Sequence, residues 1–356
     1  MKIAIYHNLN NGGAKEQMKQ WIFWLKKNKF KIIVYKPKET KTVSKNIFIN
    51  ICQTIAQSLI SDYKIASLIN KTKFDAILIF PCHKIQSPFI LSFLKNKYKV
   101  IYIFAERNRE FYENTSFFDG GIKKKISKII RFPLKIFDIT NCKQAINIVT
   151  NSYYSNYMLK KTYGKIGHVI YPGMEQIWQK RIESGNKITN FLSIGNLIKT
   201  KGHDFSIKQI SPLQNLLTII GSSNNNKEAE FIVSLAKTMK VNIKITDYIR
   251  TTDKLDIFKK TDIFLANQEN EPFGISTAEA NDCQIPVLGI NIGGTSEIIT
   301  TGINGFLYPK NVYIAKKILN KTLNNKIAFT QFNKINWKLS ALKLIEYINK
   351  TILSHA

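Results

Sequence analysis

The sequence contains few cysteines, and their positions form no binding pattern. Cys52, Cys82, Cys142 and Cys283 are scattered, without a Cys-x-x-Cys pair and without paired histidines. Neither a zinc site nor a disulfide scaffold is therefore indicated. Because free thiols suit a reducing compartment, we expect the protein in the cytoplasm.

Long apolar runs are also missing. No run approaches the ~20 residues that a membrane-spanning helix needs. The apolar start at Met1–Tyr6 is too short for a secretory signal and predicts the first strand of the fold. A chain of 356 residues fits two domains of ~100–200 residues each, and 44% hydrophobic with 22% charged residues is typical of a globular protein.

Acidic residues are scarce, with 24 Asp and Glu against 53 Lys and Arg, which gives a formal net charge of +29. Such a charge favours anionic lipid, nucleic acid or phosphorylated substrates. A general drift toward Lys, Asn and Ile would raise it equally well. Zinc-finger, helix-turn-helix and aromatic RNA-binding motifs are absent, so we expect no specific nucleic acid partner. A Gly-x-Gly-x-x-Gly motif is also absent, which gives a nicotinamide cofactor little support.

The most informative stretch runs from Ile263 to Gly294. It reads as a buried strand, a polar loop, a short helix of small residues and a second buried strand, which together make one βαβ unit of a parallel sheet. Glu271 would lie in the loop beyond the strand's carboxyl end, where open α/β sheets bind ligands, and Glu279 about two turns down the helix. Since a helix N-terminus suits an anion, this arrangement can hold a polyol and a phosphate together.

This stretch resembles the family 4 retaining glycosyltransferases of the GT-B fold. Their signature stands here as Glu271-Pro272-Phe273-Gly274, with Glu279 eight positions after the first Glu. The resemblance implies that Glu271 and the backbone of Phe273 and Gly274 hold hydroxyls of the donor sugar, and that Glu279 accepts hydrogen bonds from the nucleotide ribose. Two solvated surface glutamates are the alternative.

A second segment suits a diphosphate. A strand ends at Gly195, and a short loop reaches Lys201 before the next helix. Glycine permits close approach and lysine brings a cation. The family usually has Arg after this glycine, and its Arg and Lys together hold the donor diphosphate. Asn196 replaces that Arg, so one cation is lost unless Lys199 substitutes for it.

In the first half of the chain, Gly12 and Gly13 would offer bare N–H groups at the start of a helix, although a plain turn is nearly as good a reading. The family often carries a Gly-Gly loop here, near the donor phosphate or the acceptor. His83 follows the strand Phe74–Phe80 at its carboxyl end. The resemblance implies that it faces the reacting sugar, while a structural or exposed histidine is the alternative.

Two further segments concern the acceptor and the membrane. Glu106 and Arg109 follow the strand Val100–Phe104 and match a segment found in part of the family, which suggests acceptor binding; a polar loop with local ion pairs is the alternative. Gly120–Phe137 carries six basic residues among apolar ones and no acid. Such a helix, interrupted at Pro133, can lie on an anionic membrane, or it is an ordinary surface helix.

Helical spacing extends over residues 47–70, with a break expected near Ser61, and a further helix is expected over residues 138–145. The resemblance implies two Rossmann-like α/β domains facing each other across a cleft: an acceptor domain at 1–172, a nucleotide-sugar domain at 173–335 and a final helix at 336–356 that crosses back onto the first domain.

We therefore predict a retaining glycosyltransferase in surface polysaccharide synthesis. It would use a UDP- or GDP-linked sugar, no cofactor and no metal, and a saccharide or lipid-linked acceptor, at the inner face of the cell membrane. A catalytically inactive relative that binds a sugar or a partner enzyme is the alternative, motivated by Asn196. The candidate catalytic residues are His83, Lys201 and Glu271; the donor-binding residues are Gly12, Gly13, Gly195, Asn196, Lys201, Glu271, Pro272, Phe273, Gly274, Ile275 and Glu279; and the acceptor-binding residues are Glu106 and Arg109.

Overall fold

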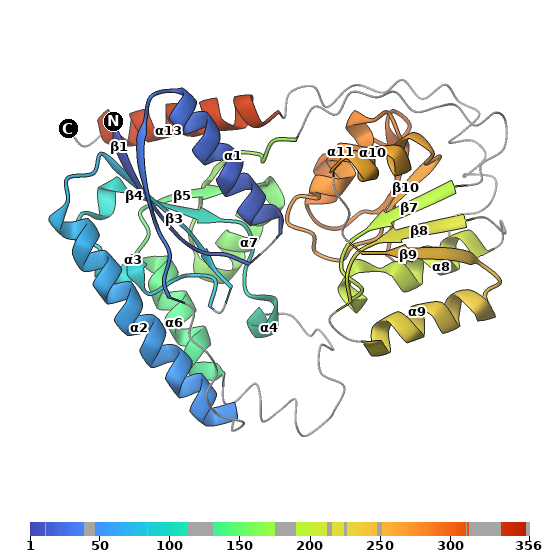
Figure 1. Cartoon of the computed structure of the whole chain (residues 1–356), viewed down its shortest axis with the longest axis horizontal. Helices are drawn as coiled ribbons and strands as arrows, with labels where there is room; N and C mark the ends of the chain where they lie inside the picture. Colours follow the sequence, from blue (N-terminus) through green and yellow to red (C-terminus); the bar gives the residue numbers. More distant parts are fainter. Residues whose placement is uncertain are drawn as a thin grey trace. The chain divides into compact units, whose positions relative to one another are not determined.

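The chain forms two compact units, each built on a parallel sheet. Unit 1 consists of Met1–Gly173 together with Trp337–Ala356, and unit 2 of Met174–Asn336 (Figure 1). The computed structural model describes residues 1–10, 12–38, 47–83, 85–112, 131–174, 190–211, 216–223, 226–247, 251–310, 312 and 336–353. Two Rossmann-like α/β units are thus present, as the family resemblance implied.

The described strands of unit 1 form a six-stranded sheet in the order β2-β1-β3-β4-β5-β6. They are β1 (Lys2–Asn8), β2 (Lys31–Tyr35), β3 (Ala76–Cys82), β4 (Val100–Phe104), β5 (Asn147–Thr150) and β6 (His168–Val169). Its helices are α1 (Gly13–Lys27), α2 (Ile47–Lys71), α3 (Ile90–Phe93), α4 (Arg109–Tyr112), α6 (Phe132–Lys143), α7 (Tyr153–Tyr163) and α13 (Trp337–Leu353).

Both faces of this sheet are buried, because alternate residues of each strand point to opposite sides. Ala4 and Ile77 pack under α2, α6 and α7, while Ile3 and Leu78 pack under α1 and α13. This explains why the strands read as continuous apolar runs rather than alternating ones.

The described strands of unit 2 form a second six-stranded sheet in the order β12-β11-β10-β7-β8-β9. They are β7 (Asn190–Ile194), β8 (Leu216–Ile220), β9 (Asn242–Thr246), β10 (Ile263–Ala266), β11 (Val287–Ile290) and β12 (Gly305–Tyr308). The surrounding elements are α8 (His203–Ile210), α9 (Asn226–Thr238), α10 (Thr251–Lys259) and α11 (Ile275–Asp282), with the 3-10 turns η2 (Lys199–Lys201) and η4 (Gly294–Glu297).

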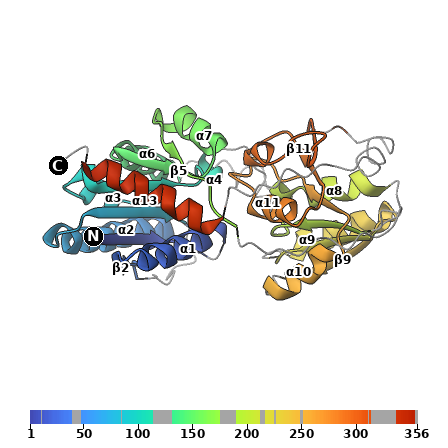
Figure 2. The same cartoon turned by 90° about the horizontal axis from the view of Figure 1, so that it is seen from above.

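The last helix returns to unit 1, as predicted. Figure 2 shows α13 lying beside α1. The indole Nε1–H of Trp21 on α1 donates to the Ser340 hydroxyl at 2.9 Å, and that hydroxyl donates to the Tyr171 carbonyl at 2.7 Å. Leu344 and Ile348 complete the core beneath the two helices.

Two expectations about helices were wrong or incomplete. α2 is continuous through Ser61, because the apolar stripe continues along the helix to Ile69. The helix expected to begin at Asp138 begins at Phe132, so Asp138 lies in the middle of α6. Pro133 lies in the first turn of α6, where its missing N–H costs no hydrogen bond. Residues 120–130 of the basic stretch lie outside the described part of the chain.

None of the described helices combines the length with the hydrophobicity needed to span a membrane.

Candidate active site

In unit 2 the strand order reverses between β7 and β10. These two strands are neighbours, but the chain continues from β7 toward β8 on one side and from β10 toward β11 on the other. Open α/β sheets bind ligands in the crevice beyond the carboxyl ends of such a strand pair. The loop after β7 carries Gly195, Asn196 and Lys201, and the loop after β10 carries Glu271. The topology therefore brings together two segments that are 70 residues apart.

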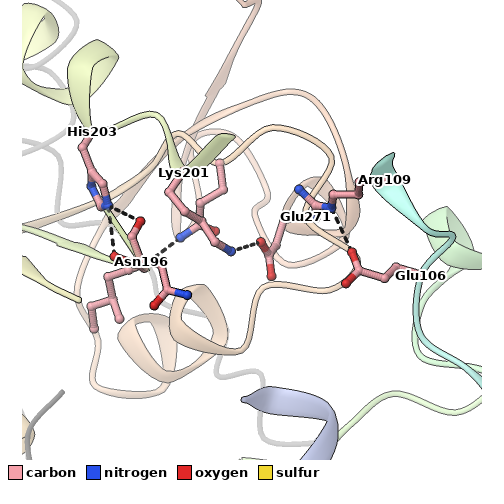
Figure 3. A network of polar contacts seen from close by, with 9 residues as sticks. Glu106, Arg109, Asn196, Lys201, His203 and Glu271 are labelled. Atoms are coloured by element: carbon pink, nitrogen blue, oxygen red, sulfur yellow. Dashed lines mark hydrogen bonds and ion pairs between the residues drawn. The ribbon is translucent and has the colours of Figure 1, made fainter. Parts of the chain in front are cut away.

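Lys201 and Glu271 form an ion pair at this point. The Lys201 Nζ lies 2.7 Å from Glu271 Oε2, and their side chains are 22% and 18% exposed. Figure 3 shows the lysine side chain extending from the loop after β7 toward the carboxylate. Because both groups keep some contact with water, the pair can be exchanged for a ligand at a modest cost in free energy.

Gly195 determines the path of the lysine side chain. Its φ is +158°, and a Cβ atom added there would lie 2.9 Å from Cδ of Lys201. The absent side chain thus leaves room for the aliphatic stem of Lys201 to pack against the loop.

His203 fixes the backbone of the same loop, and the sequence analysis did not select it. Its Nε2–H donates to the carbonyls of Gly195 and Asn196 at 3.1 and 3.3 Å (Figure 3). Ser193 Oγ lies 3.2 Å from Nδ1. Burial lowers the pKa of His203, although both carbonyls oppose this. A neutral imidazole therefore ties the end of β7 to the start of α8.

The loop that carries Glu271 is held by the Gly293-Gly294 pair. The N–H of Gly294 donates to the Glu271 carbonyl at 2.7 Å. A Cβ atom at Gly294 would come within 2.2 Å of the Pro272 carbonyl oxygen, so only glycine allows this approach. Phe273 is 2% exposed and anchors the loop in the protein interior.

Gly274 ends the loop and Ile275 begins α11. Glu279 lies in the second turn of this helix, where Lys254 of α10 binds its Oε2 through Nζ. The two side chains are 15% and 20% exposed. Burial, and then the charge of Glu279, raise the pKa of neighbouring Asp282. Lys254 is a second residue that the sequence analysis missed, since it belongs to a different helix.

Unit 1 has its own reversal of strand order, between β1 and β3. Gly12 and Gly13 follow β1, and the Gly12 carbonyl accepts from the N–H groups of Lys15 and Glu16 at 3.1 Å. His83 directly follows β3. Its Nδ1 lies 2.9 Å from the Asn8 carbonyl oxygen, which can only accept, so Nδ1 carries the proton. In the neutral ring Nε2 therefore keeps its lone pair.

Glu106 and Arg109 lie beyond the carboxyl end of β4. Arg109 Nε donates to Glu106 Oε2 at 2.9 Å, as Figure 3 also shows. The arginine belongs to α4, whose last residue, Tyr112, donates its hydroxyl to Asp138 Oδ2 at 3.1 Å.

Asp138 is the centre of a buried network that no sequence pattern indicated. Besides Tyr112, it accepts from the Tyr163 hydroxyl at 2.6 Å and from the Ser87 N–H at 2.9 Å. Burial raises the pKa of Asp138 to about 6 against the opposing effect of these bonds. The network fixes α4, and with it Arg109, to α6 and α7.

Among the residues that the structure describes, no three His, Cys, Asp or Glu side chains gather as a set of metal ligands.

Comparison with known proteins gives matches along the chain. Residues 174–337 match the family described as glycosyl transferases group 1. A 41.2 kDa protein in the cps region of Klebsiella pneumoniae is 25% identical over 230 residues, 60% of this chain and 58% of its own length. The capsular polysaccharide biosynthesis glycosyltransferase CapM of Staphylococcus aureus is 24% identical over 140 residues, 37% and 36% of the two chains. The chain thus spans about half the length, or less, of such curated relatives.

Solved structures resemble the chain over its whole length. Sucrose-phosphate synthase of Thermosynechococcus elongatus superposes with a TM-score of 0.75 at 12% identity and covers 99% of both chains. Anabaena HepE in complex with UDP and glucose superposes with a TM-score of 0.65 at 16% identity and covers 100% of both. At these identities the likeness concerns the fold. Unit 2 thus matches the model of the glycosyl transferases group 1 family, and the chain has the GT-B fold.

Proposed function

We propose that this protein is a glycosyltransferase that moves a sugar from a nucleotide-sugar donor to a saccharide or lipid-linked saccharide acceptor during surface polysaccharide synthesis. The observation that carries the proposal is the Lys201–Glu271 pair at the strand reversal of the unit that matches the family. CapM is a glycosyltransferase of capsular polysaccharide biosynthesis, which supports the acceptor class, and the UDP and glucose bound by HepE support the donor class.

In this proposal, binding of the donor breaks the ion pair between Lys201 and Glu271. Lys201 releases Glu271 and binds the donor diphosphate, while Glu271 turns to hydroxyls of the sugar. The N–H groups at the start of α11 face an anion favourably, because the first turn of a helix carries unpaired donors. Glu279, oriented by Lys254, accepts hydrogen bonds from the ribose.

The proposed reaction retains the configuration of the transferred sugar and needs no metal. Negative charge develops on the leaving diphosphate, and Lys201 with the loop N–H groups stabilises it, an effect worth ~10²–10³ in rate per preorganised donor. On the acceptor side, Nε2 of His83 is the atom that accepts the proton of the attacking hydroxyl, because Nδ1 is already protonated toward Asn8.

The same proposal places the protein in the cytoplasm at an anionic membrane. At the start of α6, Phe132 and Ile136 are 58% and 46% exposed, with Lys135 between them, and the chain carries a net charge of +29. Apolar side chains beside cations suit the boundary between headgroups and acyl chains. Vesicles rich in phosphatidylglycerol should sediment the protein at low salt. Equal sedimentation with neutral phosphatidylcholine vesicles would contradict an electrostatic contact.

One observation favours an inactive relative as the second candidate. Asn196 stands where the family has Arg, and its side-chain oxygen accepts a weak bond from the Ser222 hydroxyl at 3.5 Å. Lys201, Lys254, Glu271 and Glu279 carry no net charge together, so these four side chains supply no surplus cation for a diphosphate. Such a protein would bind a sugar or a partner enzyme without turnover.

A thermal-shift panel of nucleoside diphosphates and nucleotide sugars tests both candidate functions, the active transferase and the inactive relative. A bound ligand raises the melting temperature by mass action. We expect a shift with UDP or GDP and with one sugar conjugate, followed by release of the diphosphate when a saccharide acceptor is added. Binding without release in any combination would favour the inactive relative. No shift with any nucleotide would overturn the proposal.

A further inference from the structure

Unit 1 contains a pocket of about 210 Å³ at its own strand reversal. The ends of β1 and β3, the segment after β2 and one side of α2 line this pocket, with Tyr6, Asn8, Ser58, Asp62, His83 and Phe89 among the lining side chains. All of the described lining residues belong to unit 1.

Most of the polar groups in the pocket are neutral and can both donate and accept. They are the amides of Asn8, Asn10 and Gln57 and the hydroxyls of Ser58 and Ser61. Sugar hydroxyls have the same dual character, whereas a phosphate only accepts. Phe89, Ile85 and Pro37 add apolar surface, as ligand pockets usually do.

Asp62 is the acid of the pocket, and the fold holds its carboxylate in place. It is 3% exposed; Oδ1 accepts from the Tyr6 hydroxyl at 2.6 Å and Oδ2 from the Ile90 N–H at 3.1 Å. Each carboxylate oxygen accepts more than one bond, so Asp62 can still bind hydroxyls of a ligand. A fixed carboxylate that binds adjacent hydroxyls gives orientation as well as affinity.

We propose that this pocket binds one neutral, polyhydroxylated ring of the acceptor, the size of a single hexose. The assignment rests on the proposed function, because a glycosyltransferase needs an acceptor site apart from its nucleotide site. The volume corresponds to about seven water molecules at ~30 Å³ each, which suits one sugar ring and not a nucleotide sugar.

The charge of the pocket argues against an anionic ligand. Although burial raises the pKa of Asp62 to about 6, the group is mostly ionised at pH 7 and repels a phosphate or a carboxylate. Lys38 lines the rim, but it is exposed, so water and salt screen its charge.

The position of His83 assigns the pocket to the acceptor. This residue lines the pocket, and its Nε2 keeps the lone pair that a hydroxyl proton needs. A ring bound in the pocket therefore has hydroxyls near a base, and the acceptor hydroxyl is the group that loses its proton in glycosyl transfer.

Two tryptophan variants on one helix test the proposal. Ser58 lines the pocket, whereas Ala56 is exposed on the same helix. Ser58→Trp should fill the pocket, and Ala56→Trp is the matched control for the new indole. The probes are methyl glycosides of glucose, galactose, mannose and N-acetylglucosamine, measured by saturation-transfer NMR with the full-length protein. UDP affinity is measured by calorimetry on the same samples.

At least one glycoside should bind the unmodified protein and Ala56→Trp, and bind Ser58→Trp at least tenfold more weakly, with unchanged UDP affinity in all three. Asp62→Asn, which keeps the shape of the side chain, should weaken glycoside binding about tenfold. The assignment is overturned if no glycoside binds, if Ser58→Trp binds equally well, or if inorganic phosphate displaces the glycoside. UDP binding without glycoside binding would refute the pocket alone, whereas glycoside binding without any nucleotide binding would refute the proposed function alone.

Discussion

Four acidic side chains, two in each unit, lie in opposite surroundings. In unit 1, Asp62 and Asp138 are 3% and 0% exposed, and the bonds they accept come from tyrosine hydroxyls and backbone N–H groups. In unit 2, Glu271 and Glu279 are partly exposed and each binds a lysine. A carboxylate surrounded by neutral donors is fixed in place, while a carboxylate paired with a lysine near water can change partners.

For Asp138 and the Lys201–Glu271 pair, this difference separates a structural role from ligand exchange. Asp138 joins α4, α6 and α7, so its loss should act on stability. The Lys201–Glu271 pair lies at the strand reversal of unit 2, where open α/β sheets bind ligands, so its loss should act on binding and turnover. The following experiments test whether this division holds.

The largest effect should come from Lys201→Ala. Removing the cation from the proposed diphosphate site should reduce turnover by ~10²–10³, because a preorganised charge acts on the transition state. Unfolding free energy should fall by only about 1 kcal/mol, since the ion pair is partly exposed. Steady-state kinetics and chemical denaturation measure the two quantities.

Lys199→Ala tests whether the neighbouring lysine supplies the cation that Asn196 lacks, because Lys199 is exposed on the same 3-10 turn. It should keep most of the activity. An equal loss in both variants would mean that the positive charge of the turn matters in general, and that the Lys201–Glu271 pair has no special role.

Asp138→Ala should have the largest effect on stability. It leaves the hydroxyls of Tyr112 and Tyr163 and the Ser87 N–H without their acceptor, at ~1–3 kcal/mol for each buried group. We expect unfolding free energy to fall by about 3 kcal/mol or more and UDP affinity to stay unchanged. Glu346→Ala, an exposed site on α13, is the control. If Asp138→Ala weakened UDP binding and left stability unchanged, Asp138 would act on ligand binding and not on structure.

A smaller effect is expected at the proposed ribose site. Glu279→Ala should weaken nucleoside diphosphate binding by about 1.5–3 kcal/mol, as is typical for a hydrogen bond to a charged group. Lys254→Met should weaken it in the same direction but less, because it loses only the orientation of the carboxylate. Calorimetry measures both, and Lys254→Arg should restore most of the affinity. If Glu279→Ala binds UDP normally, this residue does not belong to the donor site.

The smallest effect is a difference in pH dependence. Burial raises the native pKa of Asp62 and Asp138 to about 6, above the unfolded value near 3.8, so unit 1 should lose stability as the pH rises from about 4 to 6. Burial lowers the pKa of His203 below 6.5, so this group should destabilise unit 2 as the pH falls below 6.5. Each carboxyl should contribute about 1–3 kcal/mol.

Hydrogen exchange resolved by peptide can follow the two units separately between pH 4.5 and 7. Protection in α6 and α7 should decrease with rising pH, and Asp138→Asn should remove part of that slope. Protection around η2 and α8 should increase with rising pH, and His203→Gln should flatten it. Parallel slopes in both units would contradict the contrast between them.

Much of the fold was predictable, because buried parallel strands are continuous apolar runs. The run Ile263–Ala266 is a strand with these limits. The final helix, Trp337–Leu353, returns to unit 1, as the family resemblance implied. The break expected near Ser61 was wrong. In the structure the helix is continuous there, and Ser61 lines a pocket.

The candidate site was predictable only in part. The order of strands and loops along the chain predicted that Lys201 and Glu271 follow strand ends. Their 2.7 Å contact requires β7 and β10 to be neighbours in the sheet, and a single sequence does not predict the strand order. Lys254 and Asp138 each lie within a helix, and their partners come from other elements. His203 follows a Lys-Gly pair at the start of a helix, and nothing in the sequence indicated that it is buried, at 2% exposed.

The discontinuous make-up of unit 1 has a consequence for biosynthesis. About 160 residues separate Gly173 from Trp337, so the ribosome needs roughly 10–30 s at ~5–20 residues per second to reach α13 after the rest of unit 1 has been made. During that interval the face of α1 around Trp21 lacks its contacts with Ser340 and the apolar side chains of α13. By the time α13 is made, the sequence of unit 2 has been synthesised in full. Unit 1 is therefore the first unit to be synthesised and the last to complete its fold. Until α13 is made, the exposed face of α1 is where a chaperone should bind the nascent chain.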